Sequence, residues 1–423
     1  MSTILNNVKY IDWKTLIIKE TNIKVGNGLN GNIQFSDSPF NTEKGDYETL
    51  DCKGKLVTKA FANGHHHVYS ALARGMPPPD KQPGNFLEIL KYIWWNLDKK
   101  LDREMIRASA LFTAMDSAKN GVTFVIDHHA SPYAIDGSLE IIAEAFDEVG
   151  VSHLLCYEIS DRDGKEVSEK AFSETENYLK AKPGLIGLHA SFTVGNKTLS
   201  RAVNLAGEYN SGIHVHVAED MADQNDSIKK YGQRVIERFK EAGVLEFNKT
   251  ILGHCLYLNE KEKKVVAGSQ AWIVQNTESN LNNNVGFFNS RGLGENIFIG
   301  TDGMHSDMIR SVQATFFTGR HFDSVDPLSA WKRVRNVHRY LQLNGFEGDG
   351  DNNLIVLDYK PPTPVNNDNF LGHFIYGFRS KDVLHVISNG KLIIKDKILT
   401  TVEENEILEF SGEMAVKLWE KLN

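Results

Sequence analysis

Eight short apolar runs, each ending in polar residues, recur through the middle of the chain and constrain its fold more than any other feature. They are FANGHHH (61–67), VTFVIDHH (122–129), VSHLLCYE (151–158), LIGLHAS (185–191), GIHVHVAED (212–220), TILGHC (250–255), AWIVQN (271–276) and NIFIGTDG (296–303). Such runs are typical of buried strands, and most are separated by segments with helical spacing of apolar residues. The alternation predicts an α/β fold, a (β/α)8 TIM-like barrel with its active site at the C-terminal strand ends.

The two chain ends have a different pattern. Residues 1–57 alternate apolar and polar side chains between turn signals, and residues 354–423 do the same before a final segment with helical spacing. Asn389 and Gly390 form a strong hairpin signal within the second stretch. We therefore expect a small composite β-sandwich from 1–57 plus 354–423, with a C-terminal helix, and the barrel at 58–353 inserted between its halves.

Composition excludes several classes of protein. The chain of 423 residues carries 47 Lys and Arg against 55 Asp and Glu, a net charge of −8, which argues against binding to nucleic acid or an anionic membrane. Three cysteines, without any CxxC pair, do not suggest a disulfide scaffold and favour a reducing cytoplasm. Neither a signal peptide nor a membrane span is indicated.

The first run supplies two candidate metal ligands. On an extended strand, residues i and i+2 share a face, so His65 and His67 can both reach one cation while His66 points away. Imidazole suits divalent zinc, iron, nickel or copper. The alternative, a His-rich tripeptide with no role, is less favoured because apolar strand residues flank it.

The fifth run repeats this spacing with His214 and His216, and only one of the two need bind metal. Glu219 follows just beyond the strand, where a carboxylate can act as a general acid or base without binding the ion. His214 is more simply a buried histidine of the barrel wall.

Two further strand ends complete a candidate site. His254 ends the sixth run, and Asp302 ends the eighth. Each has an ordinary structural alternative, a satisfied core histidine and a turn Asp before Gly. A carboxylate at Asp302 would nonetheless complete a sphere of three histidines and one aspartate, with a position open for water, as in hydrolytic metal sites.

These motifs resemble a known superfamily. FANGHHHVYSALARGM looks like the first-strand HxH signature of amidohydrolases, and IHVHVAED, ILGHC and IGTDG resemble the fifth, sixth and eighth strand motifs of the cytosine deaminase-like, metal-dependent aminohydrolases. NFLEILKYIWWNLDKKLD, IDHHASP, LHASFTV, VAEDMADQNDSIKKYG and LIVLDYKPPTP are similar to the SsnA group of aminohydrolases.

The resemblance implies a role for each matching residue. It implies that the metal ligands are His65, His67, His216 and Asp302. Glu219 would be the proton shuttle, His254 would orient the oxygen at the attacked carbon, and His189 would bind substrate. The chain departs from the group's His-Asn-Pro sequence at Gln275 and Thr277, on either side of Asn276, and it has Ser191 where many members have proline. These departures lie outside the metal sphere and bear on substrate choice.

Trp94 and Trp95 lie in a segment with helical spacing after the first strand. In a barrel of this type the segment can fold over the mouth and give Trp94 as an aromatic wall for a flat substrate. Simple helix packing is the alternative for both residues.

We interpret the chain as a metal-dependent aminohydrolase that deaminates a nitrogen heterocycle, purine- or pterin-like by resemblance. One divalent metal ion is expected, zinc in preference to iron, with a small-molecule substrate and a homodimer as the assembly. Hydrolysis of a cyclic amide, or displacement of a ring halide as in chlorohydrolases, would use the same site. A non-catalytic barrel acting as a binding or scaffold protein is the alternative from another class.

Overall fold

The eight apolar runs form eight parallel strands of one sheet in a computed structural model of the chain, which describes residues 2–42 and 47–422. The strands are β6 (Phe61–His66), β7 (Val122–His129), β8 (Ser152–Ile159), β9 (Ile186–Ala190), β10 (Ile213–Val217), β11 (Ile251–His254), β12 (Trp272–Gln275) and β13 (Ile297–Ile299). Each strand pairs with its neighbour in sequence, and the chain after β13 returns to β6, where the Thr301 and Asp302 amides donate to His65 O at 3.0 Å. The predicted barrel is confirmed.

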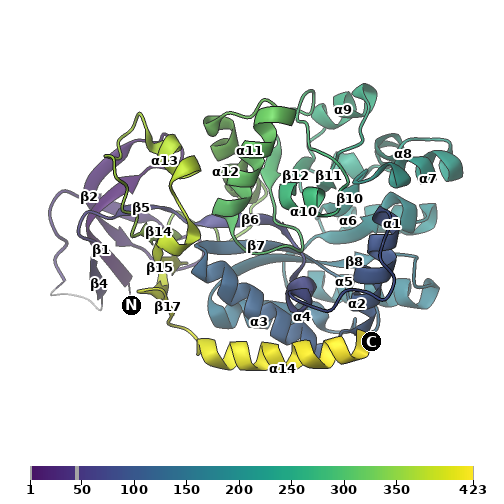
Figure 1. Cartoon of the computed structure of the whole chain (residues 1–423), viewed down its shortest axis with the longest axis horizontal. Coiled ribbons are helices and arrows are strands. Elements are labelled where there is room, and N and C mark those ends of the chain that lie inside the picture. The colour runs from purple at the N-terminus through teal and green to yellow at the C-terminus, as the bar shows by residue number, and fades with distance from the viewer. Residues whose placement is uncertain (1, 43–46, 423) are drawn as a thin grey trace.

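Helices follow the strands and cover the outside of the barrel (Figure 1). They are α3 (Arg103–Lys119), α4 (Ser138–Val149), α5 (Lys165–Ala181), α6 (Asn196–Glu208), α7 (Met221–Tyr231), α8 (Val235–Glu241), α9 (Glu260–Ala267), α10 (Thr277–Asn282), α11 (Met308–Phe322) and α12 (Pro327–Leu343). The apolar faces of these helices, except α7 and α10, share a continuous buried core with the strands. None of the helices in the described ranges combines the length and apolar character needed to span a membrane.

The chain ends form the expected separate β-structure beside the barrel (Figure 1). Its strands are β1 (Ser2–Ile11), β2 (Ile18–Val25), β3 (Ile33–Ser36), β4 (Tyr47–Asp51), β5 (Leu56–Lys59), β14 (Leu354–Leu357), β15 (Val383–Ser388), β16 (Lys391–Lys395) and β17 (Ile398–Leu399). They belong to one nine-stranded hydrogen-bonded sheet, in which β5 joins the halves by pairing with β1 and β14. Asn389 and Gly390 make the predicted hairpin, with φ of 51° and 82° as a type I′ turn requires.

The last helix, α14 (Glu404–Leu422), runs along the barrel helix α3 (Figure 1). Trp419 Nε1 donates to Leu72 O at 2.9 Å, and Ser411 Oγ donates to Ala108 O at 3.3 Å. The helix predicted from sequence therefore forms, and it packs on the barrel.

A helical segment lies between the first strand and α3. It consists of α1 (Phe86–Ile89), a π-helical turn (Leu90–Trp94), α2 (Trp95–Leu97) and a 3₁₀ turn (Asp98–Lys100). Asn85 caps its first turn by accepting from the Glu88 amide at 3.0 Å. We call residues 85–100 the mouth segment, because its apolar side chains line a pocket at the C-terminal ends of the barrel strands.

Candidate active site

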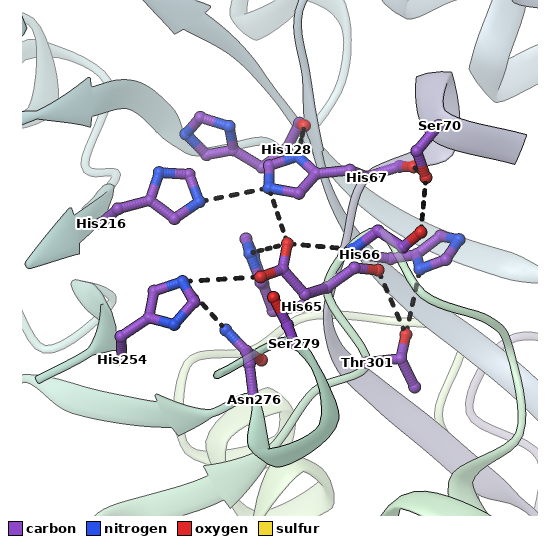
Figure 2. A network of polar contacts seen from close by, with 12 residues as sticks. His65, His66, His67, Ser70, His128, His216, His254, Asn276, Ser279 and Thr301 are labelled. Carbon is purple, nitrogen blue, oxygen red and sulfur yellow. Dashed lines mark hydrogen bonds and ion pairs between the residues drawn. The ribbon is translucent and has the colours of Figure 1, made fainter. Parts of the chain in front are cut away.

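Side chains from four strand ends, those of β6, β10, β11 and β13, meet at the mouth of the barrel. Figure 2 shows the rings of His65, His67, His216 and His254 turned toward a common centre. Ligand atoms of His65, His67 and His216 lie within 4.8 Å of one another, as do those of His65, His254 and Asp302. The geometry brings together every residue for which the sequence suggested a metal-binding role.

The nitrogens of His67 and His216 show what this centre needs. Nδ1 of His67 donates to His128 O at 2.6 Å, and Nδ1 of His216 donates to His189 O at 2.8 Å. These bonds place a proton on each Nδ1, so that a neutral ring presents Nε2 as its lone-pair nitrogen, and the two Nε2 atoms face each other at 3.2 Å. Two lone pairs at this distance repel unless a cation lies near both.

His65 and Asp302 support the same conclusion. Both ring nitrogens of His65 are buried and make no hydrogen bond within the described residues, a costly state for polar atoms. Asp302 Oδ1 lies 3.1 Å from Nε2 of His67 and 3.6 Å from Nε2 of His65. The donor set, three imidazoles and a carboxylate, therefore fits a divalent ion.

The backbone at the strand ends is held in an unusual conformation. Ala218, His254 and Asp302 have φ of 45°, 65° and 55°, in the left-handed region that non-glycine residues rarely adopt. These residues follow β10, end β11 and follow β13, where the chain must turn side chains inward. Such strain is typical of functional sites whose surroundings hold the geometry in place.

Glu219 and His254 lie close together beside the four candidate metal ligands. Oε2 of Glu219 lies 3.5 Å from Nε2 of His254, which in turn lies 3.6 Å from Oδ2 of Asp302. Burial raises the pKa of Glu219, an effect that the nearby His254 opposes. A carboxyl group with a raised pKa can hold and release a proton near neutral pH.

The pocket at this centre has an aromatic wall from the mouth segment. Trp94 and Trp95 line it together with Phe86 and Leu90, and His189 lines it from the end of β9. Nδ1 of His189 lies 2.8 Å from Thr193 Oγ1, which orients the ring. The structure thus places His189 and Trp94, the two further substrate-contact candidates, at the pocket.

Other histidines of the same motifs have different surroundings. His66 points away, with Nδ1 3.0 Å from Thr301 Oγ1, and Nε2 of His129 lies 2.9 Å from Ser131 Oγ. The His214 ring is fully buried beneath the cluster, 4.8 Å from the His65 ring. His128 also packs against the cluster, with its ring 4.8 Å from that of His216, but its Nε2 donates to Leu188 O.

Some residues at the site were not singled out from sequence. Asn280 Oδ1 lies 2.7 Å from Nδ1 of His254, and Asn283 Nδ2 donates to Glu219 Oε1 at 3.3 Å. Both belong to the Asn-rich stretch 280–284, whose polarity after a buried strand was the available signal. Glu158 and Arg162 also line the pocket, and a carboxylate ending the apolar run VSHLLCYE was the signal there.

Two positions that depart from the SsnA pattern, Gln275 and Ser191, accept hydrogen bonds from arginines of the barrel helices α12 and α8. Gln275 Oε1 accepts from Arg333 Nη1 at 2.8 Å, and Ser191 Oγ accepts from Arg238 Nη1 at 2.7 Å. Asn276 Nδ2 lies 3.5 Å from Nε2 of His254. Gln275 and Ser191 therefore support the barrel, whereas Asn276, which matches the group's pattern, contacts the site.

Taken together, the closed barrel and its buried cluster of nitrogen and carboxylate ligands define a metal-dependent hydrolase. The model of the amidohydrolase family matches residues 56–338, so the chain belongs to this family and is a hydrolase of carbon–nitrogen bonds.

Known proteins resemble the chain over most of its length. It is 27% identical to a 5'-deoxyadenosine deaminase of Methanopyrus kandleri, over 92% of this chain and 93% of the relative. It is also 27% identical to a 5-methylthioadenosine/S-adenosylhomocysteine deaminase of Thermococcus sibiricus, over 93% and 94%. These similarities extend across both chain ends as well as the barrel.

Solved structures share the fold. An adenosine deaminase from Xanthomonas campestris with bound zinc superposes with a TM-score of 0.82 at 17% identity, covering 99% of this chain and 98% of that one. An atrazine chlorohydrolase from Arthrobacter aurescens in complex with zinc gives 0.79 at 15% identity, covering 98% and 100%. At such identities the comparison establishes the architecture alone.

Proposed function

We propose that the protein removes the amino group of an adenine-type nucleoside by hydrolysis, with one zinc ion held by His65, His67, His216 and Asp302. The observation that carries this proposal is the pair of Nε2 atoms of His67 and His216 that face each other at 3.2 Å beside Asp302, while both Nδ1 atoms are held by backbone carbonyls. The choice of nucleoside follows from the deaminases that are 27% identical to the chain over 92% and 93% of its length.

Each residue at the centre has a part in the reaction. When bound, a divalent ion polarises the attacking water and so makes it a better nucleophile near neutral pH. Asp302 accepts a proton from this water as the oxygen attacks the carbon that bears the amino group. Nε2 of His254, between Glu219 and Asp302, interacts with the charge that develops on the oxygen.

Glu219 completes the proton transfers. Its carboxyl group, protonated more readily because it is buried, donates a proton to the ring nitrogen beside the attacked carbon. It then carries the proton that Asp302 took from water to the departing amine. The hydroxyl proton lost as the carbonyl forms returns Glu219 to its protonated state. Water and the aminated ring thus become a ring carbonyl and ammonia, and no proton is gained or lost overall.

The pocket suits a flat substrate. Trp94 and Trp95 offer aromatic faces on the side of the mouth segment, and Phe86 and Leu90 add apolar surface. An aromatic wall beside a small number of convergent polar groups is typical of sites for heterocyclic ligands.

A screen for ammonia release tests the proposal directly. The zinc-loaded and iron-loaded protein would be incubated with adenosine, 5'-deoxyadenosine, 5-methylthioadenosine, guanine and a pterin. We expect release of ammonia from the adenine nucleosides, faster with zinc. Loss of a ring halide or opening of a cyclic amide, without ammonia from any of these compounds, would identify a different reaction at the same site.

A further inference from the structure

The carboxylate of Glu158 lies in the pocket wall and has no role in the reaction described above. Glu158 is in β8, and its side chain is 4% exposed yet lines the same pocket as His67 and Glu219. Within the described ranges its carboxylate makes no hydrogen bond, and the polar atoms beside it are Arg162 Nη2 at 3.4 Å and His128 Nδ1 at 3.8 Å. Its oxygens therefore have capacity to accept hydrogen bonds from a ligand.

Arg162, the other charged group of this wall, is already engaged. It forms a close ion pair with Asp98. Its Nε lies 3.0 Å from Oδ2 of Asp163, and its Nη2 lies 3.4 Å from Oε1 of Glu158. Lys99 pairs with Asp163 at 2.7 Å. This cluster therefore contains three carboxylates and two cations, and it carries one surplus negative charge when Glu158 is ionised. Because both cations are already paired with carboxylates, the cluster does not attract an anionic ligand.

Glu158 faces the reaction centre from another side of the barrel. Along the sheet, β8 is three strands from β11, which carries His254, and three strands from the return of the chain after β13, which carries Asp302. Trp95 lines the same pocket as Glu158, and its ring lies 5.3 Å from the Arg162 guanidinium and 5.8 Å from the His189 ring. A substrate with its reacting carbon at the centre can therefore extend its other end toward Glu158.

We propose that Glu158 determines substrate selection: its carboxylate accepts hydrogen bonds from N–H or O–H groups at the end of the substrate away from the reacting carbon, and it rejects substrates with an anionic group there. This inference rests on the proposed deamination of a nucleoside. It makes the enzyme selective for neutral nucleosides over nucleotides that carry a phosphate.

The test compares adenosine with its 5'-monophosphate as substrates of the zinc-loaded enzyme. Burial raises the pKa of Glu158 to about 7, so the assay is run at pH 8.5, where the carboxylate is ionised. We expect the wild type to favour adenosine by roughly 100-fold or more in kcat/KM. Glu158→Gln should raise KM for adenosine by roughly 10-fold, because it removes a charged hydrogen-bond acceptor. It should also reduce the kcat/KM ratio of adenosine to the monophosphate by at least roughly 10-fold, because the carboxylate no longer repels the phosphate.

Glu166→Gln is the matched control, because Glu166 lies in the first turn of α5, its side chain is 86% exposed, and the change in net charge is the same. It should leave both kcat/KM values within twofold. An unchanged substrate preference in Glu158→Gln, or an equal loss of kcat for both substrates, would overturn the inference while leaving deamination intact. A wild type that releases ammonia from neither substrate would overturn the proposed function, and this inference with it.

Binding to the wild type provides a measurement that needs no variant. Calorimetric titration of the zinc-loaded enzyme with inosine and with inosine 5'-monophosphate, the two products, compares ligands that differ only by the phosphate. We expect inosine to bind at least roughly 10-fold more tightly. Equal or tighter binding of the monophosphate would contradict the inference even if Glu158→Gln failed to fold.

Discussion

Nδ1 of His254 lies 2.7 Å from the side-chain oxygen of Asn280, and this contact holds the ring so that Nε2 faces Glu219 and Asp302. The contact at Nδ1 fixes the orientation of the ring. We predict that Asn280→Ala lowers kcat by roughly 10- to 100-fold with a much smaller change in KM. Steady-state kinetics of ammonia release measures both constants.

Asn280→Asp separates positioning from packing, because it keeps an oxygen opposite Nδ1. It should retain most of the wild-type kcat, whereas Asn282→Ala, at an exposed position of the same helix, should behave as the wild type. Equal losses in Asn280→Asp and Asn280→Ala would show that the residue acts only through packing.

Glu219 is expected to move protons without holding the metal. Glu219→Gln keeps the shape of the side chain and its hydrogen bond with Asn283, but it cannot transfer a proton. We predict a loss of kcat by roughly 10²- to 10⁴-fold with unchanged metal content, measured by kinetics and by elemental analysis of the same sample. Loss of the metal in this variant would instead make Glu219 a ligand.

Trp94 is expected to contact the substrate ring. Trp94→Ala should raise KM by roughly 3- to 10-fold, because an aromatic contact of this kind contributes about 0.5–1.5 kcal/mol, while Trp94→Phe should restore much of the affinity. Tyr92→Ala, in the same segment but outside the pocket lining, serves as the control. Unchanged KM in Trp94→Ala would favour the alternative of simple helix packing.

His338 links stability to pH at a distance from the metal ligands. Its Nδ1 lies 2.7 Å from Asp349 Oδ2, its Nε2 accepts from Arg335 Nη1 at 3.2 Å, and burial lowers its pKa to about 4. The unfolded chain, with an ordinary pKa of about 6.5, therefore binds the proton more readily. Stability should fall as the pH drops from about 6.5 to about 4, by about 3 kcal/mol from this group alone.

Urea unfolding of the wild type and of His338→Gln at pH 7.5 and pH 4 measures this contribution. The wild type should lose about 3 kcal/mol more than the variant between the two pH values. His321→Gln, which changes an exposed histidine, should keep the pH dependence of the wild type. The same loss in His338→Gln as in the wild type would assign the acid sensitivity to other groups.

The barrel could be predicted from sequence because its signals are local. Each strand is a short apolar run that ends in polar residues, and parallel strands bring those ends to one edge, so His65, His67, His216 and Asp302 could be placed together before any coordinates existed. The Asn389–Gly390 turn was predictable for the same reason, because both residues favour positive φ.

The residues that were missed depend on contacts between distant segments. Asn280 matters only because α10 places it against β11, and Glu158 gains its significance from Arg162, Asp98 and the mouth segment. The left-handed backbone at Ala218 has no sequence signal either, because alanine normally avoids it. Hydrophobic periodicity indicates which face is buried and says little about which buried polar groups meet.

The position of the metal tests the central claim most directly. Anomalous diffraction at the zinc edge, from crystals of the zinc-loaded protein, should show one strong peak per chain, about 2.0–2.2 Å from a nitrogen of each of His65, His67 and His216 and from a carboxylate oxygen of Asp302. Absence of a peak among these four side chains, or a peak coordinated by other residues, would contradict the account.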